Sequence, residues 1–79
     1  MDFGTLLKAT LKKNNIPVSR FTKDIGFNHV AIYSVFKNKR KLTEEVFEKI
    51  LSSYPFSKRE KLSLERAFRL SRFESERFE

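Results

Sequence analysis

The sequence predicts an all-α protein, a compact bundle of about five helices in which the second and third form a helix-turn-helix. Two observations lead to this prediction. Apolar residues recur at spacings of three and four in five separate stretches, which is the period of an amphipathic helix. The 79 residues include only two glycines and two prolines, too few for an architecture rich in tight turns. This length allows one small domain, and nine phenylalanines supply its core with large side chains.

The first two helices are expected at residues Asp2–Asn14 and Val18–Ile25. Pro17 suits the start of the second helix, because its missing N–H is not needed there. Gly26 follows as the left-handed residue that ends it. The expected buried residues are Phe3, Leu6, Leu7, Thr10 and Leu11 in the first helix and Phe21 and Ile25 in the second.

The third and fourth helices are expected at residues His29–Lys37 and Glu44–Ser53. Asn28 and Thr43 are suitable N-caps, since their side-chain oxygens accept backbone N–H groups, and Pro55 stops the fourth helix. We expect Asn38 to end the third. The inward faces are predicted to contain Ile32, Val35 and Phe36, and then Val46, Phe47, Ile50, Leu51 and Tyr54.

The fifth helix is expected at residues Lys58–Phe73 and begins with the capping box Ser57 to Glu60. Its apolar residues form two sets on nearly opposite sides. The first set is Leu64, Ala67, Phe68 and Ser71, and the second is Leu62, Leu70 and Phe73. The second set either packs under the first helix or the tail, or forms a contact surface for a partner. A domain of residues 1–73 and a polar tail of residues 74–79 follow from this pattern.

The positive charge is confined to one half of the chain. Residues 1–41 contain nine Lys or Arg and two Asp, a net charge of +7, whereas residues 42–79 contain eight Lys or Arg and eight Glu, a net charge of zero. A basic half beside a balanced half favours a surface that binds a polyanion. Charges kept for solvation are the alternative.

Several classes of function are not expected. Without cysteine the chain has no disulfide, thiolate nucleophile or cysteine-based zinc site, which fits a reducing cytoplasm. One histidine and scattered serines form no nucleophile–base set. We therefore expect no enzyme, catalytic residue, cofactor or metal site. The apolar runs are also too short for a membrane span, so no membrane partner is expected.

The stretch from Val18 to Lys37 has the features of a helix-turn-helix. Thr22 is the small residue in the middle of the first helix, where the second must cross closely, and Gly26 is the turn glycine. Apolar residues for the contact between the helices are Phe21, Ile25, Phe27, Ile32 and Val35. The outward face of the second helix is then free to enter the major groove of DNA.

Residues 3–54 resemble the lambda-repressor/Cro-like (XRE-type) helix-turn-helix domain. The resemblance is carried by the stretch from Ile16 to Thr43, by the basic turn Asn38-Lys39-Arg40-Lys41, and by Val46, Phe47 and Ile50 in the fourth helix. It implies a prokaryotic or phage DNA-binding protein that acts as a homodimer on an inverted repeat. The chain departs from the family at Pro17, Val18 and Thr22, where Ser or Thr, Gln and Ala are usual.

The position of the third helix suggests which side chains would contact DNA. The base-reading candidates are His29, Val30, Tyr33 and Ser34. The phosphate-binding candidates are Arg20, Lys23, Asn28, Lys37, Lys39, Arg40 and Lys41. The candidates for a dimer interface are Leu62, Leu70 and Phe73. The alternatives to DNA contact are that His29 and the basic turn are merely solvated and that Tyr33 packs at the rim of the core.

Three functions are compatible with these features. The leading one is a cytoplasmic, sequence-specific regulator of transcription, a repressor that binds double-stranded DNA as a homodimer. The second is the DNA-binding head of a larger, ligand-sensing regulator. The third is a protein-interaction module, such as an antitoxin or an inhibitor, whose basic face meets an acidic partner.

Overall fold

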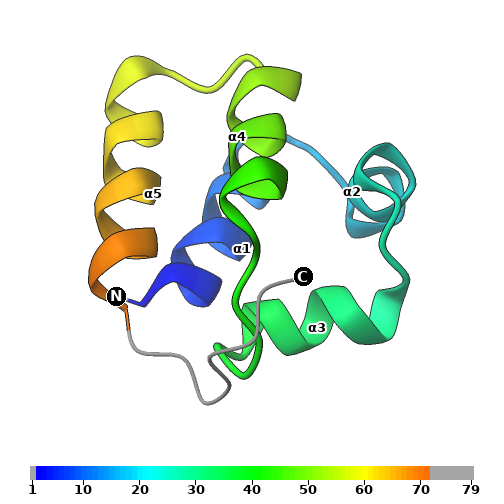
Figure 1. Cartoon of the computed structure of the whole chain (residues 1–79). Coiled ribbons are helices and arrows are strands. Elements are labelled where there is room, and N and C mark those ends of the chain that lie inside the picture. The colour runs from blue at the N-terminus through cyan, green and yellow to red at the C-terminus, as the bar shows by residue number, and fades with distance from the viewer. Residues whose placement is uncertain (1, 72–79) are drawn as a thin grey trace.

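The computed structural model describes residues 2–71, which form five α-helices and no β-strand (Figure 1). The predicted all-α bundle is therefore confirmed. The helices are α1 (Phe3–Lys13), α2 (Val18–Ile25), α3 (His29–Phe36), α4 (Glu44–Ser53) and α5 (Lys58–Leu70). α1 contacts both α5 and α3, and α2 contacts both α3 and α4. The first helix thus joins the helix-turn-helix to the rest of the bundle.

Three helices are shorter than predicted. Asp2 and Asn14 are the caps of α1 rather than its end residues, and Lys37 is the C-cap of α3. α5 was expected to reach Phe73 but ends at Leu70, because Ser71 adopts an extended backbone. The Phe3 N–H donates to Ser71 Oγ at 2.8 Å, which fixes the chain where it leaves the helix. Phe73 and the proposed boundary between residues 73 and 74 lie outside the described residues.

The core is a continuous cluster of apolar side chains from all five helices and their connections. Its centre is aromatic: Phe47 stacks on Phe68 with ring centroids 4.2 Å apart, and Phe3 meets both rings edge-on. Four residues expected inside, Leu6, Phe27, Val46 and Leu51, are only partly buried and pack against the edge of this cluster. Four buried residues lie in connections, namely Ile16, Leu42, Tyr54 and Phe56, and of these only Tyr54 was expected inside.

The predicted caps are present. Thr43 Oγ1 accepts the Val46 N–H, and Ser57 and Glu60 form both hydrogen bonds of the capping box. The hydrogen bond from the Ser57 N–H lowers the pKa of Glu60. The other carboxylate oxygen of Glu60 accepts from Asn14 Nδ2 at 3.0 Å. One glutamate therefore caps α5 and ties it to the end of α1.

α1 approaches the end of α3 so closely that only glycine fits at position 4. A Cβ on Gly4 would lie 2.3 Å from the carbonyl oxygen of Val35 and 2.4 Å from that of Phe36. In the same contact the Gly4 N–H donates to Asn38 Oδ1 at 2.9 Å. The absent side chain thus lets the N-terminus of α1 rest on the last turn of α3.

We expect Gly4→Ala to destabilise the protein by about 1–3 kcal/mol or more, because the added methyl group meets backbone atoms that cannot rotate away. Gly26→Ala is the comparison. Gly26 has φ of +75° but nothing within 4 Å of an added Cβ, so its replacement costs only the left-handed conformation, about 1 kcal/mol. Urea unfolding of both variants measures the difference. If Gly4→Ala lost no more stability than Gly26→Ala, the α1–α3 contact would be able to adjust to a methyl group at little cost.

Candidate nucleic-acid interface

The outward side of α3 presents the predicted base-reading residues together. His29, Val30, Tyr33, Ser34 and Lys37 recur at the spacing of one helical face, which we name the α3 face. Val30 is 79% exposed and Tyr33 is 42% exposed, so both present apolar surface to a binding partner. Together with Lys39 the five residues line a shallow depression. The structure therefore gathers all four base-reading candidates and two phosphate candidates on one surface.

The inward side of α3 explains why this face is free. Ile32 and Val35 are fully buried and Phe36 nearly so, which fixes the rotation of the helix. The ring of Tyr33 bridges the two sides, since it meets Phe36 edge-on at 5.8 Å and stacks with His29 at 6.5 Å. Contacts with neighbouring rings therefore hold Tyr33 and His29 in place on the α3 face.

Asn38 ends α3 as predicted and does so in the left-handed conformation, with φ of 59°. Its N–H donates to the Val35 carbonyl at 3.0 Å, and the Lys39 N–H reaches the Ser34 carbonyl at 2.9 Å. These two bonds make a Schellman motif, which satisfies the carbonyls left over at a helix end. They place Lys37 and Lys39 beside the negative end of α3. Neither lysine forms an ion pair within residues 2–71.

Asn28, another phosphate candidate, acts as the N-cap of α3. Its Oδ1 accepts the Ala31 N–H at 2.8 Å, so the side-chain oxygen is occupied. The amide NH₂ group still carries two donors that a phosphate oxygen accepts. Asn28 is exposed and adjoins His29, so it lies at the edge of the α3 face.

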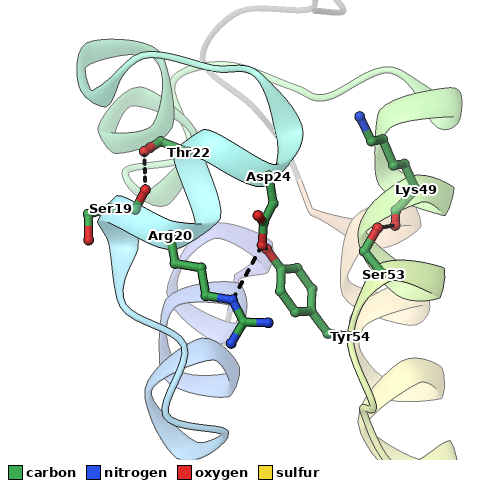
Figure 2. A network of polar contacts seen from close by, with 7 residues as sticks. All are labelled: Ser19, Arg20, Thr22, Asp24, Lys49, Ser53 and Tyr54. Carbon is green, nitrogen blue, oxygen red and sulfur yellow. Dashed lines mark hydrogen bonds and ion pairs between the residues drawn. The ribbon is translucent and has the colours of Figure 1, made fainter.

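Arg20 and Lys23 lie on α2 and do not line the depression on α3. Arg20 takes part in a contact between α2 and α4 (Figure 2). Its Nε lies 3.5 Å from Asp24 Oδ2, and its guanidinium carbon lies 5.8 Å from the centre of the Tyr54 ring. The hydroxyl of Tyr54 donates to the same carboxylate oxygen at 2.7 Å. Arg20 therefore has a structural contact in addition to any contact with a polyanion, whereas Lys23 is exposed.

Arg40 and Lys41 are half-buried. The ammonium group of Lys41 lies 5.4 Å from the centre of the Phe68 ring, which places it against α5 rather than on the α3 face. The residues of the predicted basic turn therefore lie on two different surfaces. Lys39 stays with the α3 face, and Lys41 covers an aromatic ring of the core.

The α2–α4 contact also affects ionisation. Burial and the hydrogen bond to the Asp24 carboxylate raise the pKa of Tyr54 well above its ordinary value of 10.0. The protonated phenol is therefore the form that the folded protein stabilises. This contact fixes α2 on α4 and thereby helps to hold the helix-turn-helix on the bundle.

The second apolar set of α5 lies at the surface. Leu62 is 58% exposed and Leu70 is 71% exposed, so these two do not pack under α1. Leu70 borders a hollow that Leu6 and Ala67 also line. The third member predicted for this surface, Phe73, lies outside the described residues. An apolar strip therefore remains uncovered by the helices of residues 2–71.

Two further observations complete the description. No helix within residues 2–71 is long and apolar enough to cross a membrane. The same part of the chain contains no group of three His, Cys, Asp or Glu side chains that could hold a metal ion. Comparisons with protein-family models, curated protein sequences and solved structures find no match to this chain.

We expect Tyr54→Phe to lower the free energy of unfolding by about 1 kcal/mol at neutral pH, since one hydrogen bond is lost. Because folding raises the pKa of Tyr54, its contribution is complete below pH 10 and is lost as the pH rises from 10 through the folded-state pKa. Denaturant unfolding between pH 8 and about 11 should therefore show the wild type and the variant converging in stability. A constant difference across this range would contradict the role assigned to the phenol.

Proposed function

We propose that the protein binds double-stranded DNA in a sequence-specific manner and regulates transcription, with α3 in the major groove. The observation that carries this proposal is the α3 face, where hydrogen-bonding, apolar and cationic side chains occur together on an exposed helix. An α-helix with its side chains is about 10–12 Å across, which fits the width of the major groove. The protein acts in this proposal by binding and not by catalysis.

Each side chain of the α3 face has a matching partner on DNA. His29 is suited to donate to guanine N7 or O6, Val30 to contact the methyl group of thymine, and Ser34 to bond with either kind of base edge. Tyr33, held by its neighbouring rings, is suited to a sugar or a phosphate. These pairings assign base recognition to the first part of α3, as expected for a recognition helix.

The phosphate contacts come from cations around this face. Lys37 and Lys39 are exposed and have no carboxylate partner among residues 2–71. Exposed, unpaired lysines release the counterions of DNA when they bind its phosphates, which makes affinity dependent on salt. Lys23 and Asn28 are exposed and are further candidates, while Arg20, Arg40 and Lys41 are secondary candidates because they are engaged or half-buried.

The resemblance to lambda-repressor/Cro-like domains supports a homodimer that reads an inverted repeat and represses by occluding a promoter. The strip of Leu62 and Leu70 on α5 supplies an exposed apolar surface suited to such a dimer. It lies on α5 and thus apart from the α3 face, so one surface pairs the subunits while the other contacts DNA.

Selection of bound sites from a library of random duplexes tests the proposal as a whole. A regulator of this kind should recover related half-sites and prefer them over random DNA by about a thousandfold or more. The spacing of the half-sites should be near one helical turn or a multiple of it. Equal binding to all duplexes would contradict specific recognition.

We expect Lys37→Gln with Lys39→Gln to weaken binding to all duplexes alike and to reduce the slope of log affinity against log salt by about 2. Lys49→Gln with Lys58→Gln removes the same charge from exposed positions outside the α3 face and should change the slope little. Ser34→Ala or Val30→Ser should instead change the preferred base pair, by about 1–3 kcal/mol at one position. Fluorescence anisotropy with the selected duplex measures both effects. Similar slopes for the two lysine pairs would contradict the assignment of phosphates to the α3 face.

We expect Leu62→Lys with Leu70→Lys to convert a dimer into a monomer at micromolar concentration, because like charges would then face each other across the interface. Ser19→Lys with Ser52→Lys adds the same charge at exposed positions elsewhere and should leave the dimer intact. Sedimentation equilibrium measures the mass of each variant. A folded Leu62/Leu70 variant that remains dimeric would disprove this choice of surface.

A further inference from the structure

A third hollow lies where α1, the start of α2 and the end of α3 meet. It is an open groove of about 430 Å³ and shares no residue with the depression on α3. Its apolar lining includes Leu11, Ile16, Val18 and Phe36, and Lys8 and Lys12 stand at its side. We name it the α1–α2 groove. Sequence pattern alone does not predict this groove, because Ile16 lies in a connection and the groove forms only where three helices meet.

Among the residues that the structure describes, the charged side chains that line this groove are both positive. Lys8 and Lys12 are exposed and one helical turn apart on α1, and neither forms an ion pair within residues 2–71. Within residues 2–71 no acidic residue lines the groove. By contrast, Arg20 and Arg69 are paired with Asp24 and with Glu44 and Glu65. An apolar floor beside two unpaired cations complements a ligand that is both apolar and anionic.

We propose that the α1–α2 groove binds an acidic peptide segment of a partner protein, with a bulky apolar side chain flanked by carboxylates. The apolar side chain lies against Leu11, Ile16 and Val18, and the carboxylates pair with Lys8 and Lys12. An open groove suits a length of chain better than an enclosed small molecule. DNA phosphates would satisfy the lysines but would leave the apolar floor without a partner. The proposal goes beyond DNA binding and does not require it.

The groove adjoins the α3 face through one residue. Phe36 lines the groove and is also the last residue of α3, and its ring contacts those of Tyr33 and Phe21. A segment bound in the groove therefore contacts the side chain that supports Tyr33 from behind. This places the partner beside the recognition helix without occupying its exposed face.

The probe is a fluorescein-labelled peptide Glu-Glu-Phe-Leu-Glu-Glu, and its anisotropy is measured with the full chain at about 0.15 M salt. We expect saturable binding that weakens about tenfold or more with Lys8→Glu plus Lys12→Glu, because like charges then meet. Lys49→Glu plus Lys58→Glu lowers the net charge equally, lies outside the groove, and should leave binding within about twofold. The same peptide with Ala for Phe and Leu should bind about tenfold more weakly.

A second variant tests the apolar wall. Val18→Glu puts a carboxylate into the groove at the first residue of α2, where a negative charge favours the helix, so folding should persist. It should abolish binding of the peptide, and circular dichroism should show unchanged helix content. Several results would overturn the proposal: no binding by the wild type, equal losses for the two lysine pairs, or equal binding of the alanine peptide. So would loss of duplex binding alone in the Lys8/Lys12 variant, which would make these lysines phosphate contacts. A wild type that binds the peptide but no duplex would refute DNA binding and leave this proposal standing.

Discussion

The contact between the start of α1 and the end of α3 is the constraint on which the rest of the structure depends. Gly4 brings two helices to backbone distance, and Asn38 closes the contact with its side chain while ending α3 with its backbone. At the same end of α1, Phe3 contributes its ring to the core and its N–H to Ser71. A few residues therefore set the position of α3 relative to α1 and to the end of α5.

In this arrangement the inner side of α3 makes the contacts with the other helices, and the outer side is exposed. The inner side is buried, the end is fixed by Asn38, and α2 is held on α4 by the hydrogen bond between Tyr54 and Asp24. The exposed side chains of the α3 face are therefore available for the DNA contacts proposed above. Fixed elements around an exposed helix are what precise contacts with a base edge require.

Much of the fold follows from sequence pattern, because helical periodicity and capping are local. Gly26, Asn28 and Ser57 marked helix ends correctly, each through a backbone or side-chain preference that operates within a few residues. Long-range geometry was not predictable in this way. Nothing local distinguishes Gly4 as a contact point, since the carbonyls that exclude a Cβ lie more than thirty residues away. The early end of α5 at Ser71 likewise depends on a bond to the other end of the chain.

The candidate site was predictable to the extent that it lies on one helix. A face of α3 is fixed by phase, so His29 and Ser34 were placed together from spacing alone. The phosphate candidates were chosen by charge, and charge does not reveal a partner. Arg20 contacts Asp24 and Tyr54, and Lys41 lies over Phe68, so tertiary packing divided a set that looked uniform in the sequence.

The hydrogen bond between positions 4 and 38 also bears on how this protein can diverge. A larger residue at position 4 would push α3 away and break the bond to Asn38, while a residue at 38 without a side-chain acceptor would leave the Gly4 N–H unpaired in this contact. Each substitution alone is expected to destabilise the protein. Positions 4 and 38 should therefore change together or stay unchanged. Among distant descendants, a glycine followed 34 residues later by an asparagine is then a more durable mark of common ancestry than the exposed residues of α3, which no such packing contact constrains.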